Sequence, residues 1–396
     1  MRVPGRRAVP AVIGVAIATV LSVDVAILAE QATRRPSAES AQGAERTELV
    51  AAADDRRISQ EVAPLGRRLD PQFMIVSRDR AAVPDELLEK VRRIEGVAAV
   101  ERVDGARAEL AGKEVGIFGV DPSTFRNLTP KPTAGHDGLW RNIAAGDVAV
   151  SFVLGSDGGV ELNSRVPVSG GSRANQVRVG AYATMGIGDI DAVVSKATAR
   201  RLGMVEDNVL LVALDPKSAK STKATGRIKK AVGRLVPKKT GTLRTLDPSF
   251  DFKSSGGSGS SLSALEIRTA INAGMTKLGM PYVWGGESDA EGGYDCSGLL
   301  QWAFRQAGIR LPRVAEDQAR TGPVVPFEQA RTGDLLIWAN DPTAPGRISH
   351  IALYLGGDEM LVAPRTGDVI KIQKVYFRGF RGAVRIDRRA AVRMAG

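Results

Sequence analysis

From about residue 69 onward, apolar and polar positions alternate in short runs that predict strands and amphipathic helices in turn. The expected strands lie at 73–76, 97–103, 113–120, 147–154, 177–182 and 208–214, and the expected helices at 85–94, 193–202 and 227–235. Strands that alternate with helices at this spacing are typical of an α+β domain. The pattern therefore predicts one α+β domain over 69–245.

A stretch of small polar residues then interrupts the pattern. The sequence KSSGGSGSSLS at 253–263 consists almost entirely of Ser and Gly, which is the composition of a flexible linker. A helix is expected directly after it, over 264–279. We therefore place a linker at 246–263 and a separate α+β domain at 264–396.

The N-terminus carries a different pattern, in which three arginines precede an apolar stretch over 8–29. A basic flank before an apolar segment of this length fits a membrane anchor or a long cleaved signal peptide, and a buried core helix is the third reading. Asp24 disfavours the anchor, because a carboxylate inside a bilayer is costly. We predict a signal peptide or anchor over 1–32, a polar tether over 33–68, and an extracytoplasmic location for the rest, either membrane-anchored or secreted to the cell wall.

The charge of the chain narrows the class of partner. The formal net charge is +11, which favours an anionic partner such as a cell wall or a membrane surface. Aromatic residues make up only 5% of the chain, too few for the stacking platforms of single-stranded nucleic-acid binders, so no nucleic-acid partner is expected. The segment 217–244 holds ten Lys and Arg residues and no acid, and it is either a solvated helix face or a contact for anionic polymers or lipid headgroups. One cysteine and two histidines exclude a structural zinc site with the usual number of Cys and His ligands, and no metal or cofactor is expected.

The single cysteine lies at the predicted start of a helix that runs from Cys296 to about Gln306. Asp295 is a plausible N-cap for this helix and Gly308 a plausible C-terminal stop. The partial positive charge of a helix N-terminus lowers the pKa of a thiol and favours the nucleophilic thiolate. A lone cysteine can also be an inert buried residue, and the surrounding residues decide between these readings.

A cysteine nucleophile needs a proton acceptor, and the chain offers two histidines. His136 lies in the earlier domain and is expected to be a turn or surface residue. His350 begins an alternating segment, HIALYLG, that predicts a strand. We expect His350 to stand beside Cys296 as an imidazolium–thiolate pair that attacks a carbonyl carbon and then protonates the leaving amine.

These motifs together resemble the NlpC-type cell-wall cysteine peptidases, which have a papain-like fold. The resemblance covers about 264–396 and is carried by motifs in the family's order, namely PYVWGG at 281–286, DCSGL at 295–299, LPR at 311–313, Gln318, Gly322, GDLLIW at 333–338 and SHIALYLG at 349–356. It implies helices carrying the cysteine packed on an antiparallel sheet carrying the histidine. It also implies hydrolysis of the peptide stem of peptidoglycan, between γ-D-glutamyl and a diamino acid.

The resemblance also implies roles for individual residues. Cys296 is the expected nucleophile, His350 the base, and Tyr282 a hydroxyl near the thiol. The substrate-binding positions are expected at Asp295, Ser297, Trp284 and Arg313, although Asp295 can also be a plain N-cap. The family places a third polar residue about a dozen positions after the histidine, where this chain has Val362. Valine cannot hydrogen-bond the imidazole, and loss of the orienting group of a catalytic triad can cost orders of magnitude in rate.

Two alternatives to the endopeptidase therefore stay open. One is a catalytically weak protein that binds wall peptides and is coupled to a permease-like membrane partner. This alternative is favoured by Val362. The region 69–245 resembles the extracytoplasmic domains of MacB- and FtsX-like permeases, and the resemblance is carried by VRRIEGVAAVERV, GVDPSTFRNL, GDVAVS and AVVSKATARRLGM. It implies a binding or coupling module, and a structural spacer domain is the other reading of this region. The second alternative to the endopeptidase is a papain-like amide hydrolase or acyltransferase that acts on a different substrate.

Overall fold

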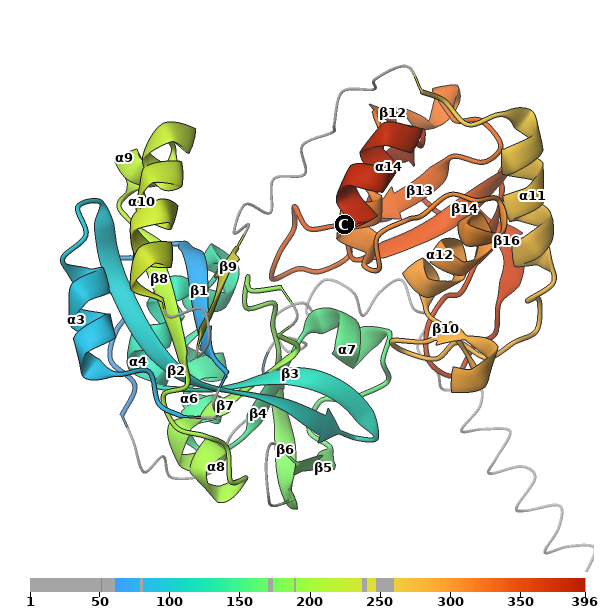
Figure 1. The fold of residues 1–396 in the computed structure, drawn as a ribbon. Helices are drawn as coiled ribbons and strands as arrows, with labels where there is room; N and C mark the ends of the chain where they lie inside the picture. The colour runs from blue at the N-terminus through green and yellow to red at the C-terminus, as the bar shows by residue number, and fades with distance from the viewer. Residues whose placement is uncertain are drawn as a thin grey trace, which may run out of the picture. The chain divides into compact units, whose positions relative to one another are not determined.

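A computed structural model describes residues 51, 61–78, 81–169, 174–188, 190–236, 241–246 and 260–395 (Figure 1). The predicted segment 1–32, most of the tether and most of the Ser/Gly linker lie outside the described residues. No helix of the described part combines the length and apolarity needed to cross a bilayer. Residues Leu49–Gly396 belong to one compact unit of the chain.

The described residues between 71 and 245 form a nine-stranded sheet with the strand order β3-β7-β4-β6-β5-β2-β8-β1-β9. Its strands are β1 (Pro71–Ser77), β2 (Val97–Leu110), β3 (Lys113–Val120), β4 (Val148–Val150), β5 (Arg165–Ser169), β6 (Ala174–Tyr182), β7 (Ala192–Ser195), β8 (Val209–Leu214) and β9 (Gly241–Thr245). The helices are α3 (Asp85–Arg92), α4 (Pro122–Phe125), η1 (Arg126–Leu128), α5 (Lys131–Ala134), α6 (Asp137–Ala144), α7 (Phe152–Ser156), α8 (Lys196–Arg201), α9 (Pro216–Ala219) and α10 (Thr222–Leu235).

Strand β8 is buried along its whole length, because it pairs with β1 and β2 in an antiparallel manner and has both faces covered. On one face, Leu210 and Val212 belong to the same apolar cluster as Val91 of α3 and Val232 of α10. On the other face, Leu211 packs in a second cluster, with Trp140 of α6. The strand predicted at 208–214 is therefore a central strand, and its unbroken apolar run is 209–214.

Two predicted elements of this region were wrong in the same way. The segment 147–154 was expected to be a single strand, but it divides into β4 and helix α7. The segment 193–202 was expected to be a helix, but it divides into β7 and helix α8. In each case a serine marks the change, because Ser151 and Ser195 accept hydrogen bonds from backbone N–H groups three residues ahead and cap the new helix.

The C-terminal part contains a six-stranded sheet in the order β12-β17-β13-β14-β15-β16, and every pairing in it is antiparallel. Its strands are β12 (Val324–Val325), β13 (Leu335–Trp338), β14 (His350–Gly356), β15 (Glu359–Val362), β16 (Lys371–Lys374) and β17 (Phe380–Val384), and β10 (Glu287–Ser288) pairs separately with β11 (Gly293–Tyr294). The helices are α11 (Ala264–Met275), η2 (Asp289–Glu291), α12 (Cys296–Gln306), α13 (Ala315–Gln318), η3 (Phe327–Gln329) and α14 (Arg388–Ala395). The predicted α+β class with an antiparallel sheet is confirmed, although α11 ends four residues before the expected position.

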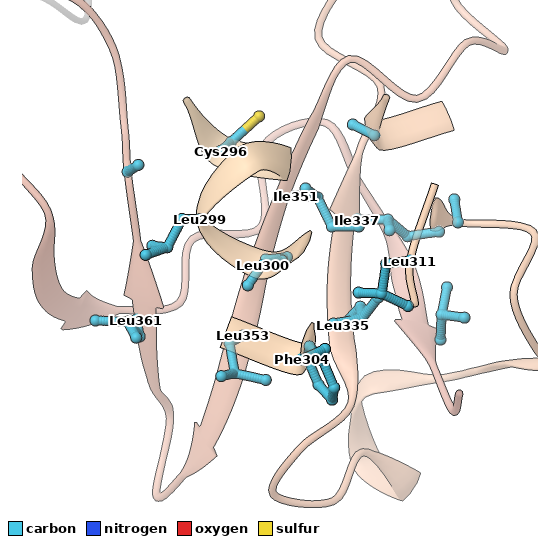
Figure 2. Close-up of a cluster of buried hydrophobic side chains, with 14 of the residues drawn as sticks. Cys296, Leu299, Leu300, Phe304, Leu311, Leu335, Ile337, Ile351, Leu353 and Leu361 are labelled. Carbon is cyan, nitrogen blue, oxygen red and sulfur yellow. The ribbon is translucent and has the colours of Figure 1, made fainter. Parts of the chain in front are cut away.

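Helix α12 packs its apolar face on the sheet (Figure 2). Leu299, Leu300 and Phe304 of the helix share one buried cluster with Ile351 and Leu353 of β14. The spacing of the helical residues places them on one face of the helix. This contact sets the position of the first residue of the helix, Cys296, relative to the first residue of the strand, His350.

Helix α12 begins where the chain passes close to an earlier loop. A Cβ atom added at Gly298 would collide with the backbone carbonyl oxygen of Gly286. We expect Gly298→Ala to lower the free energy of unfolding by about 1–3 kcal/mol, because the backbone has to shift. Gly226→Ala is the control, since no atom lies within 4 Å of the added methyl group on α10. We expect that change to be neutral or stabilising by up to about 1 kcal/mol in urea unfolding; an equal loss in both variants would contradict the role of the contact.

Candidate active site

The start of α12 carries the single cysteine, as predicted. Asp295 is the N-cap, and its Oδ1 accepts a hydrogen bond of 2.6 Å from the backbone N–H of Gly298. Gly308 follows the helix with φ of +74°, a left-handed conformation that glycine adopts without strain and that suits a helix end. Cys296 is therefore the first helical residue, and 6% of its surface is exposed.

Strand β14 brings His350 to the same place. His350 is the first residue of the strand, is 4% exposed and pairs with Trp338 of β13. The backbone N–H of the next residue, Ile351, donates a hydrogen bond to the sulfur of Cys296. The structure thus places the candidate nucleophile beside the strand that carries the candidate base. His136 caps α6 instead, where its Nδ1 accepts from the Leu139 N–H at 3.2 Å.

A cavity of about 320 Å³ opens at the thiol. Its wall includes Cys296 and all the other predicted catalytic and substrate-binding residues except His350, namely Tyr282, Trp284, Asp295, Ser297 and Arg313. Residues much earlier in the chain, which motif reasoning did not single out, also line it: Arg107, Glu114, Ser151, Val153 and Asp191. His350 lines a second cavity, also of about 320 Å³, together with Asn340 and Tyr376.

A network of charged and polar side chains lies at the wall of the first cavity. The Arg313 guanidinium donates to both carboxylate oxygens of Asp295, at 3.0 and 2.7 Å, and its Nε lies 3.1 Å from a Glu287 oxygen. Arg313 also donates to the Ser297 hydroxyl at 3.1 Å, and that hydroxyl donates to Asp295 at 3.1 Å. Three residues that the sequence suggested for substrate binding are therefore paired with one another. Glu287 was not predicted, and only its place close to the PYVWGG motif could have suggested it.

These features can be compared with known proteins. The sequence profile of the NlpC/P60 family matches residues 279–389. Residues 279–389 form an NlpC/P60 domain. The chain is 44% identical over 102 residues to a γ-D-glutamyl-L-lysine dipeptidyl-peptidase of Bacillus subtilis, covering 26% of this chain and 33% of that protein. It is 34% identical over 124 residues to the peptidoglycan endopeptidase RipA of Mycolicibacterium smegmatis, covering 28% of this chain and 24% of that protein.

Solved structures give matches of the same extent. A structure of the resuscitation promoting factor interacting protein RipA mutated at H432 matches with 29% identity and a TM-score of 0.28, over 33% of this chain and 72% of that one. RipD of Mycobacterium tuberculosis, a non-catalytic NlpC/p60 domain protein adapted to peptidoglycan binding, matches with 31% identity and a TM-score of 0.25, over 30% of this chain and 95% of that one. The chain spans a third or less of the length of the curated relatives named above.

The protonation states in the NlpC/P60 domain differ from the ion pair that the sequence suggested. Burial, followed by the negative charge of Asp295, raises the pKa of the Cys296 thiol far above its usual range. Burial lowers the pKa of His350 to about 4. Both groups are therefore neutral at pH 7, because desolvation outweighs the partial charge of the helix N-terminus. The Ile351 hydrogen bond favours the thiolate but does not reverse this balance.

Tyr282 lies close to the thiol, as the resemblance implied. It is 5% exposed, and its pKa is raised by burial and then by the negative charge of a Cys296 thiolate. Its backbone is fixed by a hydrogen bond from its N–H to the Asp368 carbonyl at 2.9 Å. The phenol therefore stays protonated and can act as a hydrogen-bond donor in the cavity.

Val362 is the last residue of β15 and is 1% exposed. It packs in an apolar cluster with Trp338, Ala352 and Met360. The side chain at this position is therefore part of a packed apolar surface and offers no hydrogen bond to His350. Among the described residues, no group of three or more His, Cys, Asp or Glu side chains is arranged to hold a metal ion.

The lowered pKa of His350 gives a testable pH dependence. The unfolded chain binds a proton at this residue below about pH 6.5, whereas the folded chain does so only below about pH 4. The stability that neutral His350 contributes is therefore complete above pH 6.5 and is lost as the pH falls toward 4. We expect urea unfolding to show a steeper loss of stability between pH 6.5 and 4 in the parent than in His350→Gln; parallel curves would contradict the shift.

The charge of Asp295 gives a second prediction. Asp295→Asn removes a negative charge beside the thiol and should lower the Cys296 pKa. Alkylation by iodoacetamide at pH 8 should then be faster by up to about tenfold, since the thiolate fraction of a weakly ionised thiol changes tenfold per pKa unit. Glu287→Gln is the matched control, because it also removes a partner of Arg313 but leaves the carboxylate next to the thiol. Equal rates in the two variants would contradict the prediction.

Proposed function

We propose that the NlpC/P60 domain is a cysteine endopeptidase that hydrolyses amide bonds in the peptide stem of peptidoglycan, between γ-D-glutamyl and a diamino acid. The observation that carries the proposal is the placement of Cys296 at the start of α12, hydrogen-bonded to the strand that begins with His350. The relatives described above, a γ-D-glutamyl-L-lysine dipeptidyl-peptidase and a peptidoglycan endopeptidase, support the substrate class.

The reaction starts from a neutral Cys296 thiol and a neutral His350 imidazole. His350 accepts the thiol proton as the Cys296 sulfur bonds to the amide carbon, so charge is created only during attack. The oxyanion is stabilised by the backbone N–H of Cys296, at a helix N-terminus, and by the Tyr282 hydroxyl. The carbon–nitrogen bond then breaks, and His350 returns its proton to the leaving amine. Water, deprotonated by His350, cleaves the resulting thioester and regenerates the thiol.

The charge of the chain supports the same setting. A net charge of +11 favours association with an anionic wall or membrane surface. Most basic residues of α10 point away from its buried positions, Ile228 and Val232, so that they are available to an anionic polymer. We propose an extracytoplasmic location on these grounds, with the N-terminal segment as anchor or export signal and the region 69–245 as a separate module.

One observation favours a second function, namely binding of wall peptides without turnover. Val362 is buried and apolar, and it supplies no hydrogen bond to His350. In that case the cavity at Cys296 would hold a stem peptide that is not cut. A membrane protein partner coupled through 69–245 would belong to this second function.

The decisive experiment incubates the purified chain with stem peptides that contain γ-D-glutamyl bonded to a diamino acid. We expect mass spectrometry to find a new amine terminus on the diamino acid, because the acyl group passes to Cys296 and then to water. Cys296→Ala should reduce the rate by at least about a thousandfold. Products from another amide, or acyl transfer to an added amine, would point to a different papain-like activity.

The control for this experiment is binding of the same peptide to Cys296→Ala, measured by calorimetry. Saturable binding without turnover by the parent would establish the wall-peptide-binding function in place of the endopeptidase. If the parent does not hydrolyse the peptide and Cys296→Ala does not bind it, both functions are contradicted.

A further inference from the structure

The imidazole of His350 lacks the partner that its proposed role requires. A general base has to be held in one tautomer and one orientation, and a third polar group does this in catalytic triads. In the part of the chain that the structure describes, no side chain forms a direct hydrogen bond with the His350 ring, and burial is the only cause of its pKa shift. Val362 cannot supply the bond.

The cavity beside His350 contains other polar groups. Its charged lining residues are Asp157, Arg365, Asp368 and Lys371, and its neutral polar ones are Asn340, Gln373 and Tyr376. Lys371 and Asp368 are paired at 2.7 Å. Gln373 lies on β16, which is separated from β14 by β15, so that its backbone is about 10 Å from that of His350's strand.

Tyr376 is connected to His350 more directly, through a single tryptophan. The Trp338 ring stacks on the Tyr376 ring, with centroids 4.9 Å apart and an interplanar angle of 27°. The same indole contacts the His350 ring at a centroid distance of 5.7 Å. The Trp338 Nε1–H also donates to the Tyr376 carbonyl oxygen at 2.9 Å, which fixes the backbone of the tyrosine.

The hydroxyl of Tyr376 is held as well. It forms a hydrogen bond with the Asn340 side chain, and burial raises the pKa of the phenol to about 12, so that the hydroxyl keeps its proton at neutral pH. Asn340 is itself confined, because its backbone N–H donates to the Ser349 hydroxyl at 3.0 Å and its Oδ1 lies against Gly379. Gly379 has φ of +77°, and a Cβ atom at that position would collide with Oδ1.

We propose that Tyr376 is the positioning residue for His350 and replaces the polar group that the chain lacks at Val362. Its hydroxyl, held by Asn340, reaches the imidazole through one water in the shared cavity and selects the tautomer that accepts the Cys296 proton. A volume of about 320 Å³ with polar groups on its wall is sufficient for such a water. This inference rests on the proposed endopeptidase, whose base it completes.

The test compares Tyr376→Phe with the parent in the full chain. Phenylalanine keeps the ring that stacks on Trp338 and removes only the hydroxyl. Tyr354→Phe is the matched control, because Tyr354 lies on the same strand as His350 but packs against Phe327 and does not line the cavity. We expect Tyr376→Phe to lower kcat about ten- to a hundredfold with KM nearly unchanged, as loss of an orienting hydrogen bond does.

A second readout does not require activity. The chain has two histidines, so ring-nitrogen NMR shows two imidazoles, and His136 serves as the internal reference. We expect the His350 nitrogens to report one tautomer in the parent and a mixture in Tyr376→Phe, with His136 unchanged. If His136 also moves, the variant is misfolded, and Asn340→Ala, which releases the hydroxyl while leaving the tyrosine in place, is measured instead and should show the same mixture.

A rescue variant separates positioning from packing. Val362→Asn added to Tyr376→Phe supplies a polar group at the other position and should restore kcat to within about threefold of the parent, since the two sites act on one imidazole. An unchanged tautomer in both Tyr376→Phe and Asn340→Ala would overturn the proposal. If the parent does not hydrolyse stem peptides, the endopeptidase has failed, while the NMR comparison still decides the role of Tyr376.

Discussion

The contact between the start of α12 and the start of β14 is the constraint on which the candidate site depends. The helix is held against the strand by buried Leu299, Leu300 and Ile351, and the Ile351 N–H reaches the Cys296 sulfur. A shift of either element by one residue would move the Ile351 N–H away from the Cys296 sulfur and break this contact. The Asp295 cap and its Arg313 partner fix the N-terminus of α12 at this contact.

The same contact determines the protonation of the site, because it buries both the thiol and the imidazole. A site this buried favours neutral forms, so that the thiol and the imidazole are both uncharged at pH 7. In the proposed reaction the proton transfer occurs during attack, which makes the orientation of the imidazole more important than it would be in a preformed ion pair. The proposed endopeptidase therefore needs a group other than Val362 to orient His350, and the group proposed is Tyr376, which stacks on Trp338.

The region 71–245 shows how much a single polar residue can change local structure. The serines at 151 and 195 each end a buried strand and cap the helix that follows it. Hydrophobic spacing alone merged the two elements in both places, since four apolar residues do not distinguish a strand from a helical turn. A cap is recognised only when the polar side chain is considered together with the N–H groups ahead of it.

The sequence by itself determined the α+β class, the helix that begins at Cys296 with its Asp295 cap, and the strand that begins at His350. These features follow from local rules, because caps, periodicity and short motifs depend on neighbouring residues. The resemblance also identified Val362 as a departure. Tertiary structure alone decided the protonation of the thiol and imidazole, since burial is a property of the packed chain. It also brought Asn340 and Tyr376 to His350, because pairing across the sheet and stacking on Trp338 join residues that no local pattern connects.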